Sequence, residues 1–414
     1  MHIVTRYYPI TICFAHNVYS WRQCPLFMVE CLSAMKLTRS IIMSCALLFC
    51  LVSGCRCLRE WPYKDRLSSI DSAVKEEIQE GNIPGAVILI GQADKILYHK
   101  AFGYEVTEPY RERMTKDTVF DIASLTKPIA TATSIMVLVD RQKIKLTDRV
   151  ATYLPAFAAN GKELVQISHL LTHTSGLPAY TSADELKGQF GSPCPDKVIE
   201  KICSLKPQSS PGEEFCYSCL GYIILAKIVE VVSGENIDNF AKENVFASLK
   251  MKHTTYNPPS SWDKNIAATQ IVNGQLLRGT VHDPLARLMD GKSGNAGVFS
   301  TAYDLSIYCR ILLNNGTYHG VKVLSPEVVT MLTAAQSHGR AFGFDVHSSY
   351  SWPKGSYAPE KAFCHAGYTG TAIVCDPVTK IYIILLTNRV HPHDKGTTKP
   401  VCRKIADIVF QTYK

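Results

Sequence analysis

The sequence predicts an α/β fold in which both ends of the chain build one antiparallel sheet, flanked by terminal helices, with a mostly helical second subdomain. Three observations support this: helical spacing near each terminus, a pair of β-rich runs at each end, and helical, loop-rich sequence between them. The 414 residues, of which 46% are hydrophobic, suffice for a large core. This composition excludes a disordered, collagen-like or coiled-coil chain.

The first half of the predicted sheet follows an amphipathic helix. Apolar residues recur at helical spacing from Leu67 to Ile78, and Gly81 follows as a stop signal. The β-rich runs Ala86 to Gly91 and Lys95 to Ala101 are joined by a polar turn and predict a hairpin.

The C-terminal end repeats this arrangement. A second hairpin is predicted from Thr371 to Cys375 and Ile381 to Thr387, and Val401 to Gln411 carries apolar residues on one helical face. The aliphatic part of the last strand is far shorter than the roughly 20 residues needed to span a bilayer. We therefore expect it to be a buried strand.

Residues 36–55 have the features of an export signal. Lys36 and Arg39 precede an apolar run from Ile41 to Val52, which ends in small residues before Cys55. This ending resembles a bacterial lipobox, which implies that Cys55 carries a lipid. The protein is then exported and lipid-anchored in the periplasm, and Arg56 after Cys55 favours the outer membrane.

These features predict four regions. Met35 stands directly before the signal, so residues 1–34 are expected to be an upstream extension from an overlong gene prediction. The signal peptide then covers residues 35–54, a lipidated tether covers 55–66, and one folded domain covers 67–412. Within that domain we expect a central helical insertion at about residues 125–290.

Charge and cysteine usage exclude several function classes. The net charge of +8 is diffuse, without a cluster of Lys and Arg interleaved with aromatics, so nucleic-acid binding is set aside. The nine cysteines after Cys55 predict mostly free thiols with one or two bridges. His169 and His173 have the spacing of a zinc pair but lack the glutamate of H-E-x-x-H, so no metal site is predicted.

The strongest chemical signal is the pair Ser124 and Lys127. In the stretch Asp121 to Val139 they lie three residues apart at the start of a predicted apolar helix, so their side chains share one face. A serine hydroxyl becomes nucleophilic when a base takes its proton, and a lysine desolvated in a pocket can serve. The amide of Ser124 could also stabilise an oxyanion. Alone, S-x-x-K occurs by chance on many helix surfaces.

Two later motifs could supply partners. Tyr217 precedes another apolar helix, and its phenol could act as an acid or base beside Lys127. The alternative is an ordinary aromatic at a helix start. The stretch His365 to Thr371 has small residues that let a backbone approach a ligand closely. There His365 could orient an anion or the tyrosine, and the Tyr368 N–H could be a second oxyanion donor.

The order of these motifs, with supporting stretches such as HLLTHTSGLP, resembles the serine β-lactamase and penicillin-binding-protein family. The resemblance covers roughly Leu67 to Thr412 and lies in the class C β-lactamase-like branch, closest to the penicillin-binding protein 4B type of D-Ala-D-Ala carboxypeptidase. It implies a β-lactamase/transpeptidase-like fold and no cofactor. It also implies these roles: Ser124 as acylated nucleophile, Lys127 as its base, Tyr217 as second acid/base, and His365 with Gly367 on the substrate-docking strand.

Two positions depart from the family pattern. Cys219 stands where the tyrosine motif usually has Asn or Asp to hydrogen-bond substrate and lysine, and a thiol is a much weaker partner. Asn295 stands where relatives usually carry the His of Gly-His-Ala-Gly. These changes put substrate choice and rate in question more than acylation.

The resemblance implies a serine acyl-transfer hydrolase that acts on peptidoglycan stem peptides through an acyl-enzyme on Ser124. An esterase or a β-lactamase stays open, because loop shape selects the leaving group. A catalytically weak, lipid-anchored relative that binds the cell wall is a further alternative. Expected partners are a peptidoglycan peptide or small acyl substrate and, through the anchor, a membrane; no oligomeric state is predicted.

Overall fold

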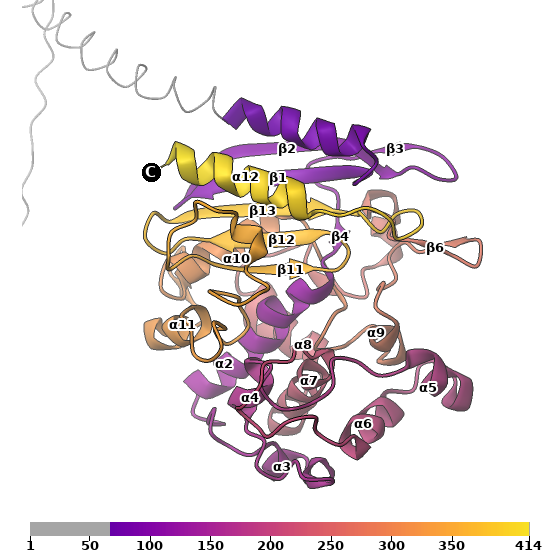
Figure 1. Ribbon diagram of the computed structural model, residues 1–414, viewed down its shortest axis with the longest axis vertical. Coiled ribbons are helices and arrows are strands. Elements are labelled where there is room, and N and C mark those ends of the chain that lie inside the picture. The colour runs from indigo at the N-terminus through magenta and orange to yellow at the C-terminus, as the bar shows by residue number, and fades with distance from the viewer. Residues whose placement is uncertain (1–66, 414) are drawn as a thin grey trace, which may run out of the picture. The chain divides into compact units, whose positions relative to one another are not determined.

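The computed structural model describes residues 67–413, so the predicted extension, signal peptide and tether, with Cys55, lie outside the described residues (Figure 1). Its main sheet has six strands in the order β11-β12-β13-β1-β2-β3. The neighbours β13 and β1 join the two ends of the chain, as predicted. The strands are β1 (Gly85–Gln92), β2 (Lys95–Val106), β3 (Glu112–Arg113), β11 (Phe363–Gly367), β12 (Thr371–Cys375) and β13 (Ile381–Thr387).

Helices occupy most of the middle of the chain and both flanks of the sheet. In chain order they are the helix at residues 67–79, α2 (Thr133–Asp140), α3 (Val150–Tyr153), α4 (Ile167–Leu171), α5 (Ala183–Phe190), α6 (Pro195–Ser204), α7 (Cys219–Ser233), α8 (Ile237–Ala241), α9 (Pro284–Leu288), α10 (Ala302–Leu313), α11 (Pro326–Thr333) and α12 (Lys399–Thr412). None of these helices is both long and apolar enough to cross a membrane.

Short strands connect the sheet to the helical part. They form a three-stranded sheet in the order β4-β8-β5 and two small hairpins. Their bounds are β4 (Phe120–Asp121), β5 (Thr255–Tyr256), β6 (Ile271–Val272), β7 (Gln275–Leu276), β8 (Val298–Ser300), β9 (Thr317–Tyr318) and β10 (Val321–Lys322). Because β4 leads directly into the segment that carries Ser124, this small sheet positions the predicted nucleophile.

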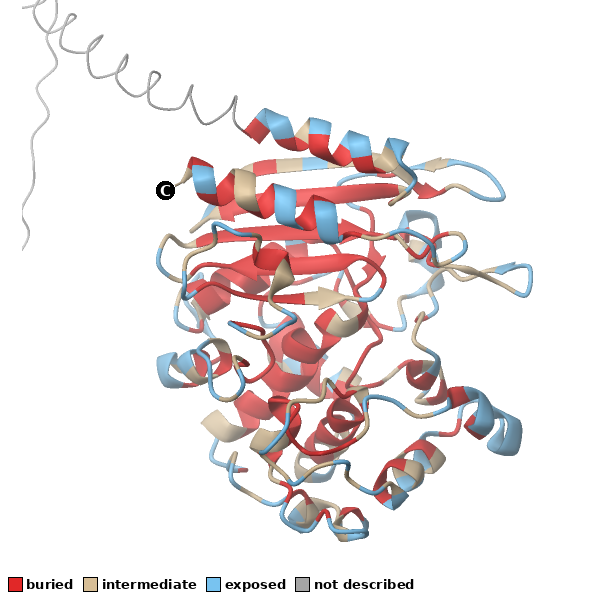
Figure 2. Ribbon diagram, in the orientation of Figure 1, coloured by how far each residue is buried: buried red, intermediate tan, exposed pale blue. Residues whose placement is uncertain are grey.

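Side chains of the main sheet are buried on both of its faces. On β1, Ile88 and Ile90 pack with the helix at residues 67–79 and with α12, in one core. Val87 and Leu89 point to the opposite face, into the larger core shared with α10 and the helical part. Figure 2 shows β1 and β13 buried along nearly their whole length. Because both faces of these strands are buried, their sequences are continuous runs of apolar residues.

The apolar helix predicted to begin at Ser124 and Lys127 is not regular. It begins as a 3-10 turn at Ala123–Leu125 and continues as a π-helical segment at Lys127–Ala132 before α2. Pro128 lacks a backbone N–H, and the Thr133 hydroxyl donates to the Pro128 carbonyl at 2.8 Å. The Thr133 backbone N–H also donates to the Pro128 carbonyl, five residues earlier, which is the spacing of a π-helical turn.

We expect Ile384→Ala to lower the free energy of unfolding by about 2–5 kcal/mol, because Ile384 is fully buried in β13 and truncation leaves a cavity. Urea unfolding followed by circular dichroism measures this change. Val378→Ala, in the exposed turn before β13, is the matched control and should change it by less than about 0.5 kcal/mol. Equal effects of the two substitutions would contradict the assignment of β13 to the core.

Candidate active site

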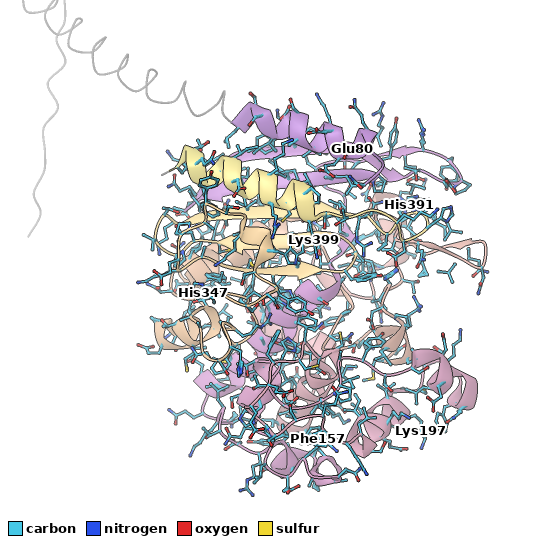
Figure 3. The ribbon with its side chains drawn as sticks, in the orientation of Figure 1. Glu80, Phe157, Lys197, His347, His391 and Lys399 are labelled. Atoms are coloured by element: carbon cyan, nitrogen blue, oxygen red, sulfur yellow. The ribbon has the colours of Figure 1, made fainter. Side chains whose placement is uncertain are left out.

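A pocket of about 400 Å³ opens where β11, the edge strand of the main sheet, meets the turn that carries Ser124. It brings together five of the residues singled out from the sequence: Ser124, Tyr217, His365, Gly367 and Tyr368. Other lining side chains are Asp345, Tyr350, Trp352, Arg389 and Lys399, the last at the beginning of α12 (Figure 3).

The turn before Ser124 is held by a buried carboxylate. Ala123 has φ = +46°, which is strained for a residue with a side chain. Asp121 accepts hydrogen bonds from the backbone N–H of Ala123 at 2.8 Å and of His282 at 2.7 Å. Burial raises the pKa of the Asp121 carboxyl to about 6. Asp121 therefore fixes the conformation in which Ser124 faces the pocket.

Strand β11 approaches this turn so closely that position 367 has no room for a side chain. A Cβ at Gly367 would lie 2.5 Å from the Ile122 carbonyl oxygen and 2.2 Å from the Thr371 hydroxyl. That hydroxyl donates to the Ile122 carbonyl at 3.0 Å. The backbone of Gly367 and Tyr368 thus forms a pocket wall beside Ser124, where the sequence predicted an oxyanion donor.

Lys127 is fully buried and binds three partners. Its Nζ donates to Ser124 Oγ at 2.9 Å, to the Asn295 carbonyl at 2.9 Å and to Cys219 Sγ at 3.5 Å. Burial lowers the pKa of this ammonium, whereas Cys219 and Tyr217 raise it when they are ionised, and the net direction is upward. The predicted base and nucleophile are therefore in direct contact.

Tyr217 lies between two aromatic rings. His173 stacks on it at a centroid distance of 4.4 Å and Tyr350 at 4.8 Å. Burial raises the pKa of the Tyr217 phenol, although the Lys127 ammonium and the Ser124 hydroxyl lower it in part. At neutral pH the phenol is thus protonated and can donate a proton next to both residues.

His365 and Cys219 are uncharged at neutral pH. Burial, with Arg340 and Lys127 nearby, holds the pKa of His365 well below its usual value. Neither ring nitrogen of His365 has a partner among the described residues, so it makes no hydrogen bond to Tyr217. Burial also raises the pKa of the Cys219 thiol. His365 therefore offers the pocket a neutral donor and acceptor.

The sequence did not predict the buried ion pair next to Tyr217. The Arg340 guanidinium pairs with the Asp345 carboxylate, and both side chains are fully buried. Arg340 also lies 5.8 Å from the centre of the Tyr217 ring, and a β-bridge joins Asp345 to Cys364 next to His365. No short motif marks this pair, because the contacts depend on distant segments coming together.

Other chemistry-bearing residues have structural partners. His169 Nδ1 accepts from the Gln166 N–H, and His173 Nδ1 accepts from the Ser218 N–H. Among residues 67–413 no group of three potential metal ligands was found. The eight cysteines in this range are all free, so the one or two predicted bridges are not present there.

Comparison with known proteins identifies the family. The sequence model of the Beta-lactamase family matches residues 70–406. The chain belongs to this family. An N-acetylmuramyl-L-alanine amidase of Bacillus subtilis (strain 168) is 32% identical over 79% of this chain and 81% of its own length. A protein of Escherichia coli (strain K12) named "Putative D-alanyl-D-alanine carboxypeptidase" is 30% identical over 79% and 83%.

Solved structures agree with the family assignment. The octameric penicillin-binding protein homologue from Pyrococcus abyssi superimposes with a TM-score of 0.68 at 25% identity, over 83% of this chain and 77% of that one. EstCE1, a hydrolase with promiscuous acyltransferase activity, gives 0.69 at 23% identity over 85% and 100%. The fold is thus that of β-lactamases and penicillin-binding proteins, and the chain is a hydrolase of the serine acyl-transfer type.

We expect acylation to accelerate with pH, because Lys127 must lose a proton to act as base and its pKa is raised. Between pH 7 and 9, kcat/KM for a p-nitrophenyl ester should rise about tenfold per unit, measured against a Ser124→Ala blank. Cys219→Ala removes a sulfur that accepts a hydrogen bond from the Lys127 ammonium, so it should lower the Lys127 pKa and move the rise to lower pH. A flat profile would contradict Lys127 as the base.

Proposed function

We propose that the protein is a serine hydrolase of peptidoglycan stem peptides that removes a terminal D-Ala through an acyl-enzyme on Ser124. The carrying observation is the 2.9 Å contact between Lys127 Nζ and Ser124 Oγ in a pocket walled by an edge strand. A relative at 30% identity bears the name of a D-alanyl-D-alanine carboxypeptidase, which supports this substrate.

The residues have distinct roles in this reaction. Lys127 takes the hydroxyl proton while Ser124 Oγ attacks the carbonyl carbon of the scissile amide. The negative charge that develops on the carbonyl oxygen is stabilised by the N–H groups of Ser124 and Tyr368. Tyr217 protonates the departing amine. Water then attacks the acyl-enzyme and releases the shortened peptide.

A second candidate cleaves a different bond of the same material. The relative at 32% identity is named as an amidase for the bond between N-acetylmuramyl and L-alanine. The same nucleophile and base would serve there, because only the fit of the groups flanking the amide differs. Esterase and β-lactamase activity are also compatible with this pocket, and so is a wall-binding relative with little turnover.

Intact-protein mass spectrometry tests the proposal. After incubation with a labelled penicillin, we expect a penicilloyl adduct on the wild type and on Ser134→Ala, but none on Ser124→Ala. Ser134 is the matched control, a buried serine in α2. After incubation of the wild type with a D-Ala-D-Ala pentapeptide, we expect the peptide to lose its terminal D-Ala. Release of an intact stem peptide from a muramyl peptide would instead favour the amidase, and no acylation by either substrate would contradict the proposal.

The sequence features at Cys55 support a further part of the proposal: export, and lipid anchoring in the periplasm at the outer membrane. In cells expressing the full chain with labelled palmitate, we expect label on the wild type and its loss in Cys55→Ala. Cys57→Ala, two residues away, is the matched control and should keep the label. Label that survives in Cys55→Ala would contradict the anchor.

A further inference from the structure

The turn between β11 and β12 carries Tyr368, which stands between two glycines. Gly367 precedes it, and Gly370, with φ = +109°, follows two positions later. The Gly370 N–H donates to the Gly367 carbonyl at 3.0 Å and closes the turn. A glycine is allowed more backbone conformations than other residues and has no side chain to fix it. The direction of the Tyr368 N–H therefore depends on the contacts of the two side chains between the glycines.

Both of these side chains are anchored. Thr369 is buried, and its hydroxyl donates to the Asp121 carbonyl at 2.8 Å. The Tyr368 hydroxyl donates to Asp394 Oδ2 at 2.8 Å. Arg389 Nη1 donates to the other carboxylate oxygen of Asp394 at 2.9 Å, and its guanidinium lies over the Tyr368 ring, 4.5 Å from the ring centre. The ring is thus held in place although Tyr368 is 58% exposed.

The loop that carries Asp394 is itself fixed to the rest of the fold. It follows β13, and its Pro392 carbonyl accepts from the N–H of Ile271, the first residue of β6, at 2.9 Å. The His391 Nε2 accepts from the Thr107 N–H at 2.9 Å (Figure 3). The Asp394 carboxylate is therefore a fixed acceptor for the Tyr368 hydroxyl.

A second contact joins Tyr368 to the turn of the nucleophile. The His282 ring stacks on the Tyr368 ring at a centroid distance of 5.8 Å, with 20° between the ring planes. The His282 ring also lies against Gln270, with 3.0 Å between Nε2 and Oε1. The backbone N–H of His282 donates to the Asp121 carboxylate, which also accepts from the Ala123 N–H. Asp121 therefore connects the nucleophile turn with the ring that lies on Tyr368.

We propose that Asp394 and His282 are positioning residues for the oxyanion hole. They fix the Tyr368 side chain, and with it the direction of the Tyr368 N–H relative to the Ser124 N–H. A donor must point at the place where charge develops, so a misdirected N–H weakens binding of the transition state more than binding of the substrate. This inference rests on the proposed function, in which these two N–H groups stabilise the carbonyl oxygen.

Removal of the Asp394 carboxylate tests the proposal. For Asp394→Ala we expect the rate of Ser124 acylation by saturating p-nitrophenyl acetate to fall about fivefold, with unchanged ester affinity. Phenylboronic acid forms a tetrahedral adduct with a serine, which mimics the transition state, and should bind about fivefold more weakly. Asp394→Asn keeps an acceptor for the Tyr368 hydroxyl and should restore at least half of the lost rate. A wild-type rate and boronate affinity in Asp394→Ala would overturn the proposal.

Further variants test whether the two residues act through the Tyr368 side chain. Tyr368→Phe removes only the hydroxyl and should slow acylation about threefold. Added to Asp394→Ala, it should cause no further loss, because the bond is already absent. His282→Ala removes the stacked ring but keeps the N–H that binds Asp121, and it should slow acylation about threefold. A further loss in the double variant, or an unchanged rate in His282→Ala, would contradict the proposal.

Two controls separate positioning from a loss of stability. Tyr153→Phe, at the end of α3, removes another tyrosine hydroxyl that donates to a carboxylate, that of Asp148 at 2.6 Å, and it should leave the acylation rate unchanged. The amplitude of the p-nitrophenol burst reports the fraction of active protein. It should be equal in all of these variants, because a positioning residue changes the rate and not the number of folded sites.

Failure of this inference differs from failure of the proposed function. If Ser124→Ala is acylated as fast as the wild type, Ser124 is not the nucleophile and the proposed function is wrong. If acylation depends on Ser124 but is insensitive to Asp394→Ala, Tyr368→Phe and His282→Ala, only the positioning role is wrong.

Discussion

A cation buried in the protein interior is the constraint on which the site depends. An ammonium group without water must find its hydrogen bonds within the fold, because an unpaired buried charge costs several kcal/mol. Lys127 finds them on three separate parts of the chain: the turn of Ser124, the first residue of α7 and the segment before β8. The lysine is therefore satisfied only when these parts are in place, and the same contacts that satisfy it assemble the nucleophile and its base.

The main sheet supplies the second half of the site. Its edge strand β11 approaches the turn of Ser124 so closely that only a glycine fits at position 367. The hydroxyls of Thr369 and Thr371 bind the carbonyls of Asp121 and Ile122, which joins the hairpin to the nucleophile turn. These two bonds therefore link the C-terminal hairpin to a turn that lies 248 and 249 positions earlier in the chain.

The sequence predicted those features whose residues lie close together in the chain. Periodicity alone predicted both hairpins and the terminal helices, and the i, i+3 spacing predicted that Ser124 and Lys127 meet. Tyr217 and His365 needed the family resemblance, because a single tyrosine or histidine has no distinctive spacing. Arg340 had no such signal, and neither did the carbonyl of Asn295, since every residue has a carbonyl. The π-helical segment was missed because apolar spacing does not report how a helix is wound.

The pairing of β1 with β13 also governs the order in which the molecule can fold. Strand β1 is made early and is apolar on both faces, yet its partner β13 lies almost 300 residues later. Until that partner arrives, one edge of a buried strand is open to other chains, which is a recognised route to aggregation. Contacts of such long range also fold slowly. A chain that ends before β13 therefore lacks the partner of β1 and leaves that edge of a buried strand without its hydrogen bonds.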